Sequence, residues 1–211
     1  MEAGPLCFDS CTQTSHLRSL AMHIVFLGPP GAGKGTQTLR LKDYLKIAHL
    51  STGEMLRQAK EAGTELGSEA AHYMKAGKLV PDDLVVRIVA DRLKDEDCNP
   101  GCLFDGFPRT VPQAEALDRM LAERSTPLDL VLALNVSEPQ LIERLLARGR
   151  SDDERETIRV RLRQYNRLTQ PLVDYYQKRK MLRQIDAEAT PDEVFSRIRE
   201  AVDAVRGQIR P

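Results

Sequence analysis

A glycine-rich segment, residues 28–36, is the part of the chain whose residue types and spacing most directly indicate chemistry. Its sequence is Gly-Pro-Pro-Gly-Ala-Gly-Lys-Gly-Thr, and it stands between the apolar run 24–27 and a helix-like segment, 37–44. A strand, a glycine loop and a helix in this order are typical of a phosphate site, because the loop turns its N–H groups inward and the positive end of the helix dipole faces the anion. Lys34 is placed to bring a positive charge to the β- and γ-phosphates of a nucleoside triphosphate.

The position of the hydroxyl group in this segment bears on how a metal ion is held. The common loop has Ser or Thr directly after the lysine, where the hydroxyl binds Mg²⁺; here Gly35 follows Lys34, and Thr36 comes one residue later. Asp105 ends an apolar run, and an acid at a strand end across from a phosphate loop helps to organise hydrated Mg²⁺. We therefore expect Mg²⁺ to enter with ATP and to be held through waters near Asp105, with no direct protein ligand.

Two further segments carry polar side chains at the starts of predicted helices. Thr52 stands at a helix start with Arg57 about one turn later, where its guanidinium could grip a phosphate bidentately. An ordinary capped helix with a solvated arginine would have the same pattern. Arg109 follows the strand that ends at Asp105, and Gln113 lies one turn into the next helix, where its amide can offer a donor and an acceptor to a base edge.

Arginine is concentrated in residues 144–167. The positions are Arg144, Arg148, Arg150, Arg155, Arg159, Arg161, Arg163 and Arg167. Arg144 and Arg148 share a helix face, a tight loop follows, and Arg161 returns on the next helix. In a chain with no net charge this indicates an anion clamp built from Arg144, Arg148, Arg150 and Arg161. The other four arginines fit a solvated, salt-bridged helical hairpin, and that alternative stays open for the whole group.

Short apolar runs alternate with helical periodicity along the rest of the chain. The predicted strands are 23–27, 47–50, 102–104, 129–134 and 181–185, and the predicted helices are 35–45, 54–60, 65–76, 82–93, 112–123, 138–148, 154–178 and 191–206. Pro171 should break or kink the long helical stretch, and Thr190 with Glu193 predicts a capping box. Alternating strands and helices indicate a parallel sheet covered on both faces, an α/β P-loop fold of three layers.

The length of 211 residues suits one domain, and Lys+Arg and Asp+Glu both number 31, so charge gives no indication of nucleic acid or an acidic membrane. There is no apolar run of membrane-spanning length and no secretory signal, so we expect a cytoplasmic protein. The four cysteines have no zinc-knuckle spacing, and Cys102 fits a buried hydrophobic position. Residues 1–21 match nothing that follows and are expected to be a disordered extension, or a misread start before Met22.

The motifs at 28–37, 51–57, 77–83, 104–113 and 144–161 occur in an order and spacing that resemble the adenylate kinases among the nucleoside monophosphate kinases. The resemblance covers essentially residues 22–206. It implies a monomer that catalyses ATP + AMP ⇌ 2 ADP with Mg²⁺. It also implies a five-stranded parallel sheet in a kinase core, 22–208, a helical insertion for the monophosphate, 51–80, and a very short lid, 147–153.

The resemblance also implies roles for individual residues. The ATP site would comprise Gly31, Ala32, Gly33, Lys34, Gly35, Thr36, Arg144, Arg148 and Ala189, with Arg144 stacked on adenine and the backbone near Ala189 touching that base. The AMP site would comprise Thr52, Arg57, Lys78, Leu79, Val80, Gly106, Phe107, Pro108, Arg109, Gln113, Arg150 and Arg161. The catalytic groups would be Lys34, Asp105, Arg109, Arg148, Arg150 and Arg161.

Some positions depart from the family pattern. Glu54 stands where the family usually has Asp, and Leu45 replaces a typical helix-ending glycine. The lid loop after Arg148 has about eight residues, so we expect the arginines and the 51–80 helices to exclude water, with Asp152 and Asp153 latching onto basic residues of a closed form.

The main alternative is a UMP- or CMP-type kinase, which typically has Ala at Thr52 and Asn at Gln113. A GTP-binding switch would need an Asn-Lys-x-Asp motif, which is absent from the sequence. A nucleotide-binding module without catalysis would be expected to lack the arginine cluster.

Overall fold

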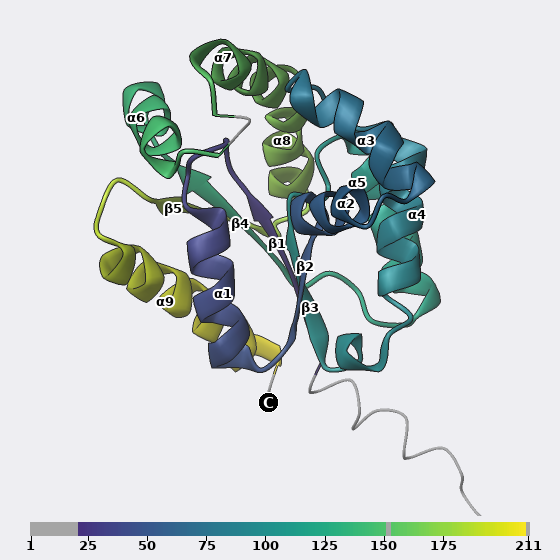
Figure 1. Cartoon of the computed structure of the whole chain (residues 1–211). Helices are drawn as coiled ribbons and strands as arrows, with labels where there is room; N and C mark the ends of the chain where they lie inside the picture. The colour runs from purple at the N-terminus through teal and green to yellow at the C-terminus, as the bar shows by residue number, and fades with distance from the viewer. Residues whose placement is uncertain (1–20, 151–152, 210–211) are drawn as a thin grey trace, which may run out of the picture.

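A computed structural model describes residues 21–150 and 153–209, and its centre is a sheet of five parallel strands (Figure 1). The strands are β1 (Met22–Leu27), β2 (Ala48–Ser51), β3 (Gly101–Asp105), β4 (Leu130–Asn135) and β5 (Leu182–Asp186), in the order β2-β3-β1-β4-β5. The expected extension, 1–21, lies outside the described residues except for Ala21.

Helices cover both faces of this sheet. They are α1 (Lys34–Leu45), α2 (Thr52–Glu61), α3 (Glu65–Lys75), α4 (Asp82–Arg92), α5 (Val111–Glu123), α6 (Glu138–Arg148), α7 (Arg155–Gln164), α8 (Pro171–Lys178) and α9 (Pro191–Ile209), with a 3₁₀ turn η2 (Glu96–Cys98) and a π-helical turn η3 (Tyr165–Thr169). Each strand and helix predicted from the sequence overlaps one of these elements. The predicted α/β P-loop fold with a five-stranded parallel sheet is therefore confirmed.

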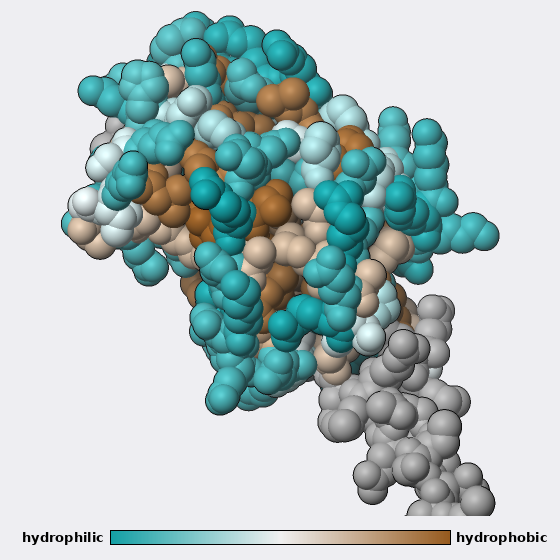
Figure 2. All heavy atoms as spheres, turned by 90° about the vertical axis from the view of Figure 1, so that its right-hand side faces the viewer, coloured by the Kyte–Doolittle hydropathy of each residue, from teal (hydrophilic) through white to brown (hydrophobic). Residues whose placement is uncertain are grey.

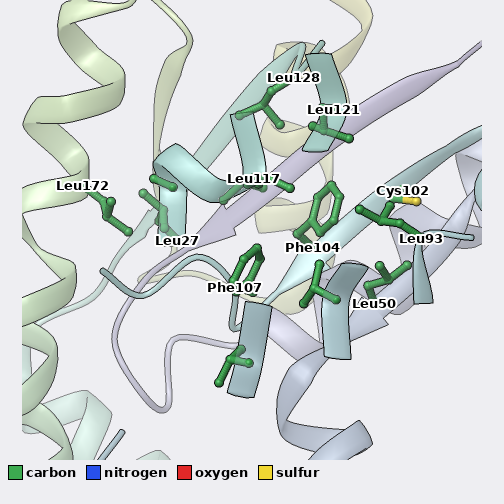
Figure 3. Close-up of a cluster of buried hydrophobic side chains, with 14 of the residues drawn as sticks. Leu27, Leu50, Leu93, Cys102, Phe104, Phe107, Leu117, Leu121, Leu128 and Leu172 are labelled. Carbon is green, nitrogen blue, oxygen red and sulfur yellow. The ribbon is translucent and has the colours of Figure 1, made fainter. Parts of the chain in front are cut away.

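Residues 24–27 of the central strand β1 are apolar without interruption because both faces of the strand are buried. Ile24 and Phe26 join the core formed with α1, α6, α7 and α9, whereas Val25 and Leu27 join the core on the opposite face. A strand buried on both sides has no solvent-facing position, so polar alternation is lost. Figure 3 shows the second core, where Phe104 lies among leucines of the sheet and of α5.

The long helical stretch 154–178 is broken before Pro171, as predicted. Helix α7 ends at Gln164, the π-helical turn η3 follows, and α8 begins at Pro171 itself. Proline has no backbone N–H and its ring displaces the preceding turn, so the helix restarts there. The predicted capping box of α9 is also present, because Glu193 Oε2 accepts from the Thr190 N–H at 2.9 Å and Thr190 Oγ1 accepts from the Glu193 N–H at 3.4 Å.

The expected insertion, 51–80, contains α2 and α3, which cross at very close range. A Cβ at Gly67 would overlap the backbone of Ala59, so only glycine permits this crossing. The space-filling view from the side of these helices is largely hydrophilic, with apolar residues exposed between polar ones (Figure 2). Among the residues that the structure describes, none of the helices is both long and apolar enough to cross a membrane.

Helix α1 ends in a left-handed residue that is not glycine. Lys46 has φ 58° and ψ 45°, and its N–H donates to the Lys42 carbonyl. A side chain in this conformation costs about 1–2 kcal/mol. We expect Lys46→Gly to raise the melting temperature by about 2–4 °C, because relief of this strain outweighs the added flexibility of the unfolded chain. Lys46→Ala is the control, and an equal rise in that variant would show that charge and not backbone strain is responsible.

Candidate functional site

The phosphate loop lies where β1 ends and α1 begins, and its shape depends on glycine. Gly31 has φ 87°, and a Cβ there would lie 2.9 Å from the Leu141 carbonyl oxygen and 2.9 Å from Leu145 Cγ, both on α6. The loop can therefore pack against α6 only without a side chain at this position. Lys34 folds back over the loop, where its Nζ donates to the carbonyls of Gly28 at 2.7 Å and Pro29 at 2.9 Å.

A cleft of about 640 Å³ opens above this loop and brings together most of the site residues expected from the sequence. The expected residues that line it are Gly31, Gly33, Lys34, Gly35, Thr36, Thr52, Arg57, Lys78, Leu79, Val80, Asp105, Gly106, Pro108, Arg109, Gln113, Arg144, Arg148, Arg150 and Arg161. Its volume is typical of ligand sites in proteins. The cleft therefore joins the phosphate loop, the 51–80 helices and the arginine cluster in one site.

Three expected site residues do not line this cleft. The Ala32 side chain is buried in the core beside α1, and the Phe107 ring is fully buried between the sheet and α5 (Figure 3). Ala189 packs against the core beside α9. The Phe107 ring anchors the loop that carries Arg109, and the expected place of this residue in the AMP site stays a prediction. The hydrophobic effect draws the large aromatic ring inward, although its neighbours face the cleft.

Asp105 lies at the carboxyl end of β3, beside the start of α1. Its Oδ2 is 3.9 Å from the position that a Cβ at Gly35 would occupy and 3.6 Å from His49 Nε2. Burial opposes the charge of this carboxylate, but His49 and the positive charges of Lys34 and Arg109 outweigh that effect and lower the pKa of Asp105. The group is therefore an ionised acid at neutral pH.

Burial and the closeness of the positively charged side chains in the cleft lower the pKa of Lys34 and of Arg109. Burial lowers the pKa of Lys34 to about 8; Asp105 opposes this change, while Arg109, Arg161 and Arg148 add to it. Burial also lowers the pKa of Arg109, and Arg161 and Arg57 lower it further. Such a cluster is unfavourable without an anion, so the cleft is suited to bind one.

Arg148 of α6 and Arg161 of α7 converge on one buried carboxylate, that of Asp153. Asp153, with a side chain 1% exposed, accepts from Arg148 Nε at 2.8 Å and Nη2 at 2.6 Å, from Arg161 Nη1 at 3.1 Å and from the Arg150 N–H at 3.2 Å. Burial opposes its charge, but these donors hold the pKa of Asp153 below its usual value. All three partners belong to one hairpin made by α6, the loop and α7, and the expectation that Asp153 latches onto basic residues of a closed form stays a prediction. Asp152 lies outside the described residues.

The lid is shorter than expected. Helix α6 continues to Arg148 and α7 begins at Arg155, so the connection is 149–154 rather than about eight residues. Gly149 ends α6 in the left-handed conformation, with φ 67°. Asp153 bonds back toward the start of this connection, where its Oδ2 accepts from the Arg150 N–H.

The side of the cleft next to α5 is organised by a single carbonyl. The Gly106 oxygen accepts from Thr52 Oγ1 at 2.9 Å and from Arg109 Nε at 2.7 Å. Gln113 is almost fully buried, and its Oε1 accepts from the Arg109 N–H at 2.7 Å. Arg144 is held on the other side, where Nη2 donates to the Ala187 carbonyl at 3.1 Å.

Two contacts that position site residues are not predicted by the sequence. Thr169, in the π-helical turn, donates from Oγ1 to the Arg109 carbonyl at 2.9 Å. Asp82, at the start of α4, accepts from Thr110 and from Gln113, each at 2.7 Å. The first had no local signal, because Pro171 predicts a break in the helix but not a contact with Arg109. The second had none either, because Asp82 and Gln113 belong to different helices.

No group of three or more His, Cys, Asp or Glu side chains with metal-binding geometry occurs in the part of the chain that the structure describes. Cys98 and Cys102 are free thiols and both are buried, as expected for Cys102; Cys7 and Cys11 lie outside the described residues.

The chain matches a family model described as adenylate kinase over residues 26–181. It is 50% identical to an adenylate kinase from Corynebacterium urealyticum over 173 residues, which cover 82% of this chain and 94% of that protein. An adenylate kinase from Thermus thermophilus is 48% identical, covering 85% of this chain and 96% of its own length. One from Mycobacterium tuberculosis is 49% identical, covering 86% and 99%.

These three relatives all carry the name adenylate kinase, so the alternative of a UMP- or CMP-type kinase gains no support from them. The family model spans well over half of the chain, and it includes the phosphate loop 28–36, the insertion and the arginine cluster. The chain belongs to the adenylate kinase family and is a nucleotide phosphotransferase.

Proposed function

We propose that the protein transfers a phosphoryl group reversibly between ATP and AMP, giving two ADP, with Mg²⁺. The observation that carries this proposal is that one cleft is lined by the phosphate loop, by a second set of polar groups on the 51–80 helices, and by arginines from α6 and α7. Phosphoryl transfer needs two anionic substrates held in line and their oxygens neutralised, and no nucleophilic side chain. Such a cleft meets these needs.

The two nucleotides would occupy different walls of this cleft. ATP phosphates would lie on the loop at 31–36, with Arg144 against the adenine. AMP would lie beside Thr52, Arg57 and Gln113, with its phosphate toward Arg109. Arg148, Arg150 and Arg161 would neutralise the group in transfer. Support comes from the packing of Arg109 and Thr52 on the Gly106 carbonyl, which holds both at one edge of the sheet.

The residues present fit a hydrated Mg²⁺. Asp105 is ionised and lies beside the phosphate loop, so it can accept hydrogen bonds from the waters of the ion. Asp105 would hold the waters of the ion, which when bound would supply positive charge near the phosphate oxygens of ATP. Lys34 would supply a second positive charge at the same oxygens once it leaves the carbonyls of Gly28 and Pro29.

Water must be excluded during transfer, or ATP would be hydrolysed. We propose that the 51–80 helices and the hairpin of α6 and α7 exclude water together, because the loop 149–154 is too short to cover the site. The two parts already approach each other at Gly77, where a Cβ would lie 3.2 Å from the Thr157 carbonyl oxygen and 3.3 Å from Arg161 Cγ. In this proposal 51–80 and 147–153 act as the moving units on a core, 22–208.

We also propose that the enzyme acts as a monomer in the cytoplasm. All groups assigned to the two nucleotides come from a single chain, so a second copy is not needed to complete the cleft. The free thiols of Cys98 and Cys102 fit a reducing compartment.

Selectivity for the monophosphate tests the proposal. A coupled assay would follow ADP formation from MgATP with AMP, UMP, CMP or GMP as the phosphoryl acceptor. The kcat/KM for AMP should exceed that for UMP and CMP by about ten- to a hundredfold. The smaller pyrimidine would leave buried polar groups such as the Gln113 amide unpaired, at about 1–3 kcal/mol each. Comparable kcat/KM for CMP and AMP would favour the UMP- or CMP-type kinase, and tight MgATP binding without AMP-dependent ADP formation would refute the transfer reaction.

A further inference from the structure

A carboxylate outside the cleft holds the amide of Gln113 from behind. Asp82 is the first residue of α4, and its Oδ1 accepts from Gln113 Nε2 at 2.7 Å. Its Oδ2 accepts from Thr110 Oγ1 at 2.7 Å, and Thr110 Oγ1 in turn accepts from the Gln113 N–H at 3.3 Å, capping α5. Both oxygens of Asp82 are therefore used to join the starts of two helices, α4 and α5.

These contacts determine which way the Gln113 amide faces. An ionised carboxylate only accepts hydrogen bonds, so Asp82 requires the NH₂ end of the amide on its side. The N–H of Arg109 only donates, so it requires the oxygen end, and Oε1 accepts from it at 2.7 Å. A flipped amide would place an oxygen against a carboxylate and an NH₂ group against an N–H. Both neighbours thus oppose the flipped amide.

The fixed amide has one N–H and one oxygen lone pair beyond these two bonds, and Gln113 lines the cleft. Adenine offers an acceptor ring nitrogen beside its N6 donor, which matches this pair. Hypoxanthine and guanine have nearly the same shape but offer an O6 acceptor beside an N1–H donor, so their pattern is reversed. An amide free to flip could pair with either pattern.

We propose that Asp82 is a positioning residue that makes the monophosphate site select 6-aminopurines over 6-oxopurines, by preventing the flip of Gln113. The inference rests on the proposed contact between Gln113 and the AMP base. Asp82 itself would not touch the nucleotide, and its effect would pass through the orientation of the amide.

Asp82→Asn is the informative substitution. If the new side chain keeps its oxygen toward Thr110, its NH₂ group faces Gln113, which can then present Oε1 to it. The flipped amide retains only the conflict with the Arg109 N–H. We expect the ratio of kcat/KM for AMP to that for IMP to fall by about tenfold or more in this variant, with KM for MgATP unchanged.

Asp83→Asn is the matched control. Asp83 is the next residue in the same first turn, so its substitution removes the same charge from the same helix end, but Asp83 is exposed. Its AMP-to-IMP ratio should stay at the wild-type value. An equal fall in both variants would show a general effect of charge at the start of α4 and would overturn the proposal.

Gln113→Leu separates this inference from the role on which it rests. If Gln113 reads the base, this variant alone should reduce the AMP-to-IMP ratio, and adding Asp82→Asn should change it no further. An unchanged ratio in Gln113→Leu would refute the base contact itself. A reduced ratio in Gln113→Leu with a wild-type ratio in Asp82→Asn would refute only the role of Asp82. If Asp82→Asn does not fold, Asp82→Ser serves instead, because a hydroxyl can donate or accept and should also lower the ratio.

Discussion

Replacing Lys34 by methionine is expected to lower kcat for ADP formation by at least about 10²–10³-fold. Lys34 is the cleft residue at the phosphate loop whose charge can reach the transferred group, and the flexible stem lets it exchange the Gly28 and Pro29 carbonyls for phosphate oxygens. Methionine has a similar length but no charge. Steady-state kinetics with saturating MgATP and AMP measure the loss.

The same variant should keep its stability or gain some. Burial lowers the pKa of Lys34 from 10.5 to about 8, which means that the charged form is less favourable in the folded protein than in the unfolded chain. The unfolded state therefore binds more protons between about pH 8 and 10.5, and the free energy of unfolding should rise with pH in that window. Lys34→Met should weaken this rise and leave the melting temperature at pH 7 equal or higher.

Lys42→Met is the control for both measurements. Lys42 lies on the same helix α1 but is exposed, away from the cleft. It should keep wild-type kcat and the wild-type pH dependence of unfolding. Near wild-type kcat in Lys34→Met would refute the role of Lys34 in transfer, whatever its effect on stability.

Replacing Arg150 by alanine should lower kcat by about 10³-fold or more, the size typical of an arginine that neutralises a transferred phosphoryl group. Arg150 lies on the loop 149–154 and lines the cleft, and its backbone N–H is held by Asp153 at 3.2 Å. The proposed closure would bring its side chain to the phosphates only when both nucleotides are bound. Affinity for MgATP without AMP should therefore change only slightly.

Arg159→Ala provides the comparison, because Arg159 lies on α7 with a side chain 64% exposed and pairs with Glu156 at 3.7 Å. Such exposed pairs contribute little, so kinetics and binding should stay at wild-type values. If Arg150→Ala lost MgATP affinity and kcat/KM equally with kcat intact, Arg150 would be a simple ground-state contact. The proposed role in closure would then be wrong.

The order of strands and helices could be predicted from the sequence because it depends on local signals. The run 24–27 is apolar throughout because β1 is buried on both faces, and the proline and glutamate after Thr190 mark the start of α9 within four residues. The phosphate loop is local as well, since its glycines and Lys34 are neighbours in sequence. Each of these features depends on residues that are close neighbours in the sequence, so the sequence by itself determines them.

The arrangement of the site depended on contacts between distant residues, which only the tertiary structure decides. Thr169 and Arg109 are far apart in sequence, and nothing in either segment predicts their hydrogen bond. Phe107 stands between cleft residues, yet its ring is buried, because it packs in the core that α5 also joins. Asp153 is a polar residue in a charged loop, and only the meeting of α6 with α7 makes it the buried partner of Arg148 and Arg161.

The link between Asp82 and Gln113 is the clearest example. The sequence by itself determined that an amide lies one turn into a helix after β3, and that two acids begin the helix after the 51–80 segment. It did not determine that α4 and α5 start side by side, because that depends on how both helices pack on the sheet (Figure 1). Residue types and local spacing therefore determined which chemical groups are present, and packing of the helices on the sheet decided which groups orient one another.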